Sequence, residues 1–338
     1  MAAVDAAPPH VAREGLAPYA SRAMSAWPDE VRVAPPAWID AIARGELPPG
    51  LPLARSVVID DRLGAGAWLR ALARSSGLGA IRSLRVQGRA ARARDLDALS
   101  SARSLSDLRH VALVCAGVRA DHVTPLLDPG ALGARLERLE VVDGALGDDR
   151  WWTERARTAP LTALRVLRLE GCGLAAEHFD ALARAPWFSG LESLCLRGCE
   201  VGDEAMRLWR DMRDPGLAPA SLDLSRQSPV LRRPDAHVSD RGVAALCDNP
   251  AARGLVSLDL SDNVRVQDKA AAALASSPHL HELRHLRLTR VNVSPAGWGA
   301  IAASDSLALE TLTVSEGLDP ASTEVLSEAA FRVIFERR

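Results

Sequence analysis

The sequence contains a single lysine, Lys269, and only 4% aromatic residues. Few aromatics and a formal net charge of −2 argue against a nucleic-acid-binding surface. No apolar run approaches the ~20 residues of a membrane-spanning helix, and charged residues and prolines occupy the first fifteen positions, where a signal peptide would be apolar. These absences predict a cytoplasmic protein that binds neither nucleic acid nor membranes. Arginine in place of lysine, together with abundant alanine, favours a bacterial source with a GC-rich genome.

What the sequence does contain is a repeat. The pattern apolar-x-x-apolar-x-apolar recurs every 26 to 28 residues, except for one interval of 36. An apolar pair spaced by three follows each start by about fifteen residues, as in Leu69/Leu72 and Trp298/Ile301, and residues three apart share one face of a helix. Each repeat is therefore predicted to be a short strand followed by a short helix. The pattern begins at Ala54, Ile81, Leu108, Leu136, Leu164, Leu191, Pro219, Leu255, Leu283 and Leu309.

This repeat resembles those of the leucine-rich repeat superfamily, and its long period is similar to that of the ribonuclease-inhibitor-like class. The resemblance covers roughly residues 54–314. It implies an α/β solenoid with a parallel sheet on a concave face and helices on a convex face. Strands lie about 4.8 Å apart whereas packed helices need about 8 to 10 Å, so the stack is expected to curve into a horseshoe. The resemblance also implies that Cys172, Cys199 and Asn263, each at the ninth position of its repeat, bond the backbone where the chain leaves the strand.

The ends of the chain are expected to differ from the repeats. Residues 1–52 hold nine of the 21 prolines, and we interpret them as a tail and N-terminal cap in which Trp27 and Trp38 pack on the first repeat. A separate small recognition module is the alternative. Residues 53–338 form the repeat domain, whose C-terminal cap, about 315–338, has a helix over residues 320–330 and a strand over residues 331–335.

The partner-binding surface is expected at the third, fifth and seventh positions of the repeats, which point into the concave face. Those positions are polar and carry mixed charge, which suits a protein partner better than a small molecule in an apolar pocket. The candidate contact residues on the strands are Arg138, Glu140, Arg168, Glu170, Arg197, Asp223, Asp259 and Arg287.

Two irregularities add further candidates. The repeat that begins at Pro219 carries an insertion over residues 225–237, with Arg232 and Arg233, and insertions in repeat proteins often lie on the binding face. A tolerated surface loop is the alternative. Trp152 follows the expected core residue Trp151, and adjacent helical residues do not share a face, so Trp152 is either an exposed contact residue or covered by a neighbouring repeat.

Several apparent binding motifs are incomplete or have a simpler structural interpretation. Gly64 and Gly66 lack the third glycine of a dinucleotide site, because that position is the core residue Leu69. His279, His281 and His285 lie in a turn and on a strand, with no convincing fourth metal ligand. The arginines Arg82, Arg85, Arg89, Arg92 and Arg94 form a local basic run, which is either a solvated face or a site for phosphate or an acidic partner.

No nucleophile, base and acid can be assembled from the strand-facing residues, so no enzyme activity, cofactor or metal is expected. The sequence predicts a scaffold that binds another protein through the concave face and the 225–237 insertion. The alternative is a regulator of a partner enzyme such as a small GTPase or a nuclease, since Ran GTPase-activating proteins and ribonuclease inhibitors contain repeats of this kind.

Overall fold

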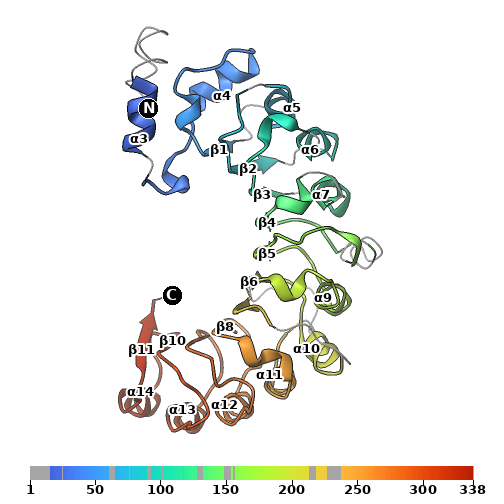
Figure 1. Ribbon diagram of the computed structural model, residues 1–338. Coiled ribbons are helices and arrows are strands. Elements are labelled where there is room, and N and C mark those ends of the chain that lie inside the picture. The colour runs from blue at the N-terminus through green and yellow to red at the C-terminus, as the bar shows by residue number, and fades with distance from the viewer. Residues whose placement is uncertain are drawn as a thin grey trace. The chain divides into compact units, whose positions relative to one another are not determined.

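The structure is a computed structural model, shown in Figure 1. The residues it describes are 16–24, 26–60, 65–75, 77–89, 93–100, 102–116, 118–127, 132–147, 154, 157–212, 218–226 and 237–337. The chain divides into two compact units, the first made of Met1–Ala145 and Ala159–Leu164 and the second of Leu146–Thr158 and Arg165–Arg338.

In the first unit, strands pair in parallel in chain order, and helices α5 to α7 pack side by side along the stack. Its helices are α3 (Ala17–Ala23), α4 (Pro36–Ala43), α5 (Ala65–Arg74), α6 (Ala93–Ser100) and α7 (Ala120–Leu127). Its 3-10 helices are η2 (Asp29–Val31), η3 (Leu51–Leu53), η5 (Arg103–Leu105) and η6 (Gly133–Arg135), and its strands are β1 (Ser56–Ile59), β2 (Ser83–Arg89), β3 (His110–Ala116) and β4 (Arg138–Val142).

In the second unit, strands again pair in parallel in chain order, and Figure 1 shows the helices running round the outside of an arc whose inner side is formed by the strands. The strands are β5 (Val166–Glu170), β6 (Ser193–Cys195), β7 (Ser221–Asp223), β8 (Ser257–Asp259), β9 (His285–Leu288), β10 (Thr311–Ser315) and β11 (Arg332–Glu336). The helices are α9 (Ala176–Ala183), α10 (Asp203–Arg210), α11 (Asp240–Cys247), α12 (Asp268–Ala275), α13 (Pro295–Ala302) and α14 (Pro320–Ser327), with the 3-10 helices η7 (Phe188–Gly190) and η8 (Pro250–Gly254).

The strand register follows the sequence repeat. Leu222 lies opposite Leu194 on one side and Leu258 on the other, so the fourth position of each repeat meets the fourth position of the next. The motif side chains are buried apart from the half-buried Leu309, and the helical pairs are buried too, including Phe179/Leu182 and the pair that ends in Trp209. The expected strand–helix repeat and the α/β leucine-rich repeat solenoid fold are confirmed.

Aspartates at the start of three helices connect consecutive repeats of the second unit. Asp203, the first residue of α10, accepts a backbone N–H bond from Gly242 in α11, over 2.9 Å. Asp240 in α11 accepts in the same way from Ala270 in α12, and Asp268 in α12 accepts from Ser294, which precedes α13. The first N–H groups of a helix have no partner within it, so each aspartate satisfies donors of the following helix.

The ninth residue of a repeat ties the chain to backbone carbonyls, as the family resemblance implies. The Asn263 amide donates to the carbonyl oxygens of Leu224 and Leu260, both over 3.0 Å. The Cys172 thiol donates to Glu170 O, and the Cys199 thiol to Leu169 O over 2.9 Å.

At the N-terminal end, Trp38 in α4 is buried, as expected. Trp27 is 53% exposed, so the expectation that it packs on the first repeat is wrong. Trp27 lies after α3 and immediately before Pro28, whose fixed φ directs the chain into η2. The Trp27 indole stays on the surface. At the other end, α14 and β11 confirm the expected helix and final strand, and β11 pairs with β10 in parallel.

Candidate partner-binding surface

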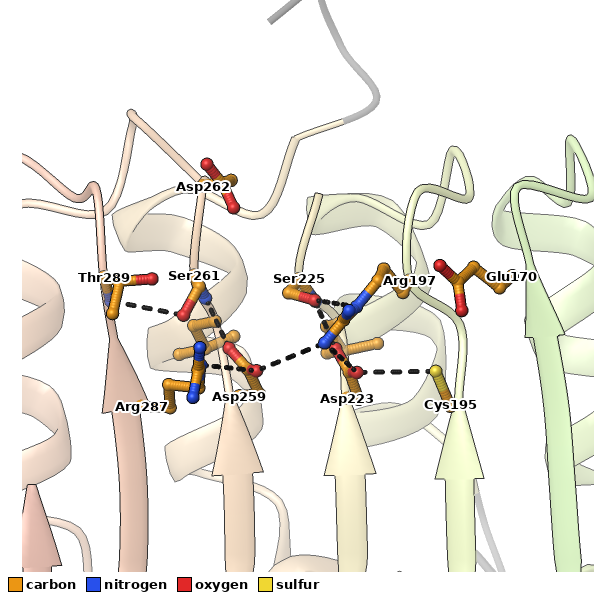
Figure 2. Close-up of polar contacts among 12 residues, drawn as sticks. Glu170, Cys195, Arg197, Asp223, Ser225, Asp259, Ser261, Asp262, Arg287 and Thr289 are labelled. Atoms are coloured by element: carbon orange, nitrogen blue, oxygen red, sulfur yellow. Dashed lines mark hydrogen bonds and ion pairs between the residues drawn. The ribbon is translucent and has the colours of Figure 1, made fainter. Parts of the chain in front are cut away.

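The third and fifth positions of the repeats lie on the strand face that points away from the helices, here called the inner face. In the second unit this face is polar and half-buried (Figure 2). Consecutive fifth positions are aligned by the strand register, so that Cys195, Asp223, Asp259 and Arg287 form a row across neighbouring strands. The repeat length therefore brings together charges that lie 28 to 36 residues apart in the sequence.

The predicted contact residues of the second unit pair with one another. Arg197 Nη2 lies 3.3 Å from Asp223 Oδ2 and 4.0 Å from Asp259 Oδ2. Arg287 Nε lies 3.3 Å from Asp259 Oδ2 on its other side, and Arg287 also pairs with Glu336 of β11. The result is a continuous row of alternating charge, in which each arginine contacts two carboxylates.

Hydroxyl and backbone groups fix the two aspartates. Asp223 Oδ1 accepts from the backbone N–H of Ser225, and Asp259 Oδ1 accepts from that of Ser261, both over 2.9 Å. The Ser225 hydroxyl donates to Asp223 and accepts from Arg197 Nε over 3.1 Å. These bonds hold both carboxylates against the ends of their strands, with their Oδ2 atoms toward the arginines.

The same geometry shifts the pKa values of Asp259 and Arg197. Burial raises the pKa of Asp259, the neighbouring Asp223 charge adds to the increase, and Ser261 and Arg287 oppose it. Burial lowers the pKa of Arg197, but Asp223 and Glu170 outweigh it and the net direction is upward. Burial and Asp223 therefore disfavour the charged form of Asp259, whereas Ser261 and Arg287 favour it.

Cys195 lies in this row without the properties of a nucleophile. Its Sγ is 3.4 Å from Asp223 Oδ2, and burial, followed by the Asp223 charge, raises its pKa to about 12. A thiol acts as a nucleophile in its deprotonated form, which this environment disfavours.

A hollow of about 290 Å³ opens on the inner face beside the row. Its lining is mainly polar: Ser221, Asp223, Ser257, Asp259, His285, Arg287, Thr311 and Thr313 contribute side chains, with Leu222 and Leu286 between them. His285 Nδ1 lies 2.9 Å from Thr311 Oγ1, so this histidine is engaged by a neighbouring strand. Among the described residues, no three His, Cys, Asp or Glu side chains are placed to hold a metal ion.

The remaining predicted residues fall into three groups. Arg168 pairs with Glu170 through Nε and Oε2 over 2.8 Å, but Glu170 is only 4% exposed and offers little surface to a partner. In the first unit, Arg138 Nε lies 2.7 Å from Glu140 Oε1. Trp152, Arg232 and Arg233 lie outside the described residues, as do residues 227–236 of the insertion.

One participant, Glu336, was not predicted for this surface. It was missed because β11 follows a weak repeat start at Ala330, and the register that pairs Val333 with Leu312 makes Glu336 a seventh position. Ser257 and His285 occupy third positions and lie on the face that the repeat predicts for them.

Comparison with known proteins agrees with the repeat. Residues 254–275 match a family model described as Leucine Rich repeat. Those residues span β8 and α12, and the other repeats place the same buried positions on the same strand–helix unit. Residues 254–275 are therefore one leucine-rich repeat within a chain that has the α/β leucine-rich repeat solenoid fold.

No curated protein matches the sequence. Among solved structures, the chain is similar to one in the yeast Rad7 and Elc1 complex, at 15% identity over 95% of this chain and 93% of that chain, with a TM-score of 0.39. A Bacteroides fragilis protein is 12% identical over 76% and 71% (TM-score 0.40), and a Listeria monocytogenes internalin 15% identical over 84% and 74% (TM-score 0.41). These likenesses are too distant to support an inference about function.

Within the described part of the chain, no helix has the length and apolar character needed to cross a bilayer.

Proposed function

We propose that this chain is a non-catalytic scaffold that binds another protein through the inner face of its repeats. The contact residues proposed are Arg138, Glu140, Arg168, Arg197, Asp223, Asp259 and Arg287, with Glu170 as a buried support for Arg168. The 225–237 insertion, with Arg232 and Arg233, and Trp152 are proposed as additional contacts.

The observation that carries this proposal is the row of fifth-position residues Asp223, Asp259 and Arg287, together with Arg197, which pairs with both aspartates. The carboxylates of this row are largely buried, and burial raises the pKa of Asp259, so that its charged form opposes folding relative to its protonated form. The contribution of the Asp259 charge to folding therefore does not by itself explain its place in the row. An ordered row of charge does orient a protein partner and speed its association.

The chemistry of the face favours a protein over other ligands. The hollow is polar and open, whereas pockets for small molecules are mostly apolar with a few polar groups. In the described residues of this row, Cys195 is the strongest nucleophile by type, and its raised pKa argues against catalysis. We infer that the chain does not itself catalyse a reaction.

We further infer a ribonuclease-inhibitor-like repeat class, because most periods are 27 or 28 residues and the repeats carry helices. Cys172, Cys195, Cys199 and Cys247 form no disulfide, which fits a reducing, cytoplasmic location, and the arginine bias fits a bacterial source. Residues 1–52 are proposed as an N-terminal cap and residues 53–338 as the repeat domain with its C-terminal cap.

The test is partner retention by the immobilised full chain from a lysate of the source organism. The inner-face variant is Asp223→Asn with Arg287→Gln, which removes one charge of each sign and keeps the net charge. The control is Glu204→Gln with Lys269→Gln, which does the same on the exposed faces of α10 and α12. We expect a protein retained by the parent and the control but lost by the inner-face variant. Equal retention by all three would contradict an inner-face site.

A further inference from the structure

Arginines occupy equivalent positions just before consecutive strands of the first unit. Arg55, Arg82 and Arg109 each immediately precede a strand, and Arg32 continues the series outward. Their backbones are linked: Arg55 N donates to Arg32 O over 2.8 Å, Arg82 N to Arg55 O over 2.7 Å, and Arg109 N to Arg82 O over 2.9 Å. We call Arg32, Arg55, Arg82 and Arg109 the arginine ladder; its rungs follow the strand spacing of about 4.8 Å.

Two rungs of the ladder are neutralised by carboxylates. Arg82 pairs with Asp29 over 3.1 Å, and Arg109 lies 3.5 Å from Glu137. Arg55 instead donates to the carbonyl oxygens of Pro52 and Ala54, both over 2.8 Å, and Arg32 donates to that of Leu53 over 3.0 Å.

Carbonyl groups satisfy hydrogen bonds without forming an ion pair. Burial lowers the pKa of Arg55, the positive charges of Arg32 and Arg82 lower it further, and Asp29 and Asp107 oppose this decrease. Arg32 is only 4% exposed, so Arg55 is the rung that can present a guanidinium without an ion pair to a partner.

Arg85 adds a second guanidinium without an ion pair, beside Arg55. It lies at the fifth position of β2, and its register neighbours are Val58 on β1 and Ala112 on β3, neither of which can form an ion pair. In the part of the chain that the structure describes, Arg85 has no ion-pair partner. The fifth-position Arg287 of the second unit, in contrast, contacts two carboxylates.

Arg85 lines a hollow of about 280 Å³ between the inner face and the segment that contains Asp29. Its other charged side chains, Asp29, Arg138 and Glu140, are already paired with one another or with Arg82. Ser56, Ser83 and His110 supply polar groups, and Val33, Val58, Val111 and Ala112 complete the lining. The hollow therefore offers one free guanidinium in a partly apolar setting.

We propose that the Arg85 hollow and the arginine ladder bind an acidic segment of a partner protein, with a carboxylate of that segment on Arg85. This inference rests on the proposed scaffold function and specifies the partner's chemistry. A guanidinium recognises a carboxylate through two parallel hydrogen bonds. The hollow has room for one side chain, and Arg55 of the ladder, which precedes the lining residue Ser56, is available to a neighbouring carboxylate of the segment. Single-stranded nucleic acid would call for stacking aromatics, and the described lining contains none.

The probe is a fluorescein-labelled oligoglutamate peptide, titrated with the full chain and followed by fluorescence anisotropy at low and high ionic strength. Arg85→Gln removes the free charge, and Arg207→Gln removes an exposed, paired arginine on α10 of the second unit as a matched control. Arg55→Gln is a second variant, and circular dichroism with thermal unfolding checks the fold of each.

We expect binding by the parent and by Arg207→Gln, weakened about tenfold or more by Arg85→Gln and also weakened by Arg55→Gln and by salt. Equal affinity for an oligoglutamine peptide, or equal binding by folded Arg85→Gln, would overturn the proposal. Tighter, Arg85-dependent binding of an oligothymidylate would overturn it in favour of nucleic acid.

The outcome is separable from that of the scaffold test. A protein partner that is lost by the Asp223→Asn, Arg287→Gln variant but retained by Arg85→Gln would leave the scaffold function standing and overturn this inference. Arg85-dependent peptide binding with no retained partner would support the acidic-segment site and contradict the inner-face scaffold.

Discussion

Asp203 Oδ1 accepts the backbone N–H of Gly242 from the next repeat, over 2.9 Å. The same oxygen accepts the N–H of Ser239 over 2.7 Å. The carboxylate of α10 thus lies against the first turn of α11, and the absence of a side chain at position 242 makes room for it. A Cβ built on Gly242 would lie well inside van der Waals contact of Asp203 Oδ1 and 3.1 Å from Asp203 Cα.

We expect Gly242→Ala to destabilise the protein by about 1–3 kcal/mol, because the added methyl group displaces the Asp203 carboxylate. This sign is opposite to the helix preference, which favours alanine over glycine by about 1 kcal/mol. The measurement is the free energy of unfolding in urea. The control is Gly299→Ala in α13, where the nearest atom, Val325 Cγ1, is 3.8 Å from the added Cβ; it should gain up to about 1 kcal/mol. A gain in both variants would show that the Asp203 contact leaves room for alanine.

Asn263 provides a graded test of the ninth position. We expect Asn263→Ala to lose about 1–3 kcal/mol, since the carbonyls of Leu224 and Leu260 lose their buried donor. Asn263→Cys should lose less, because Cys172 and Cys199 donate to carbonyls at this position of their own repeats. The measurement is the free energy of unfolding of both variants in urea under reducing conditions. Equal losses would contradict a donor role for the thiol.

Stability should fall in alkaline solution because of the buried thiols. Burial raises the pKa of Cys247 to about 12 and that of Cys199 to about 11, whereas an unfolded thiol titrates near ~8.5. Above ~8.5 the folded chain still holds protons that the unfolded chain has released. The stabilisation is therefore complete below ~8.5 and is lost as pH rises toward the folded values.

Each such thiol contributes a slope of about −1.4 kcal/mol per pH unit in that window. The free energy of unfolding, measured between pH ~9 and ~10.5, should fall less steeply for Cys247→Ala than for the parent by about this amount. Parallel slopes would mean that Cys247 titrates normally in the folded protein.

Asp259→Asn should separate binding from stability. The raised pKa of Asp259 means that its stabilising contribution is present below the unfolded value near ~3.9 and is lost as pH rises through the folded value. At pH 7 the charge is therefore a cost to folding, and asparagine keeps an acceptor for the Ser261 N–H. We expect unchanged or higher stability at neutral pH together with loss of the retained partner. A clear loss of stability would show that the pair with Arg287 outweighs burial.

The sequence predicted the fold at the level of individual residues because its repeat is exact in register. The period predicts that a leucine at the fourth position lies opposite the fourth positions of the neighbouring repeats, and Leu222 does lie between Leu194 and Leu258. The roles of Asn263 and Cys199 were implied by the family resemblance at the ninth position of the repeat.

The pairing of the charged residues could not be predicted in the same way. The period places Asp223, Asp259 and Arg287 on adjacent strands, but whether their side chains meet depends on rotamers and on the Ser225 and Ser261 turns. The exposure of Trp27 also had no signal, because it precedes the first repeat. Asp203 begins α10, and its bonds to the start of the next helix could not be predicted because they depend on how the two helices pack.

These bonds give the second unit a direction. Asp203, Asp240 and Asp268 each satisfy the start of the helix that follows, and none of these three bonds runs the opposite way. The side-chain acceptor always lies in the earlier repeat and the backbone donor in the later one, so the array of carboxylates has the same polarity as the polypeptide chain.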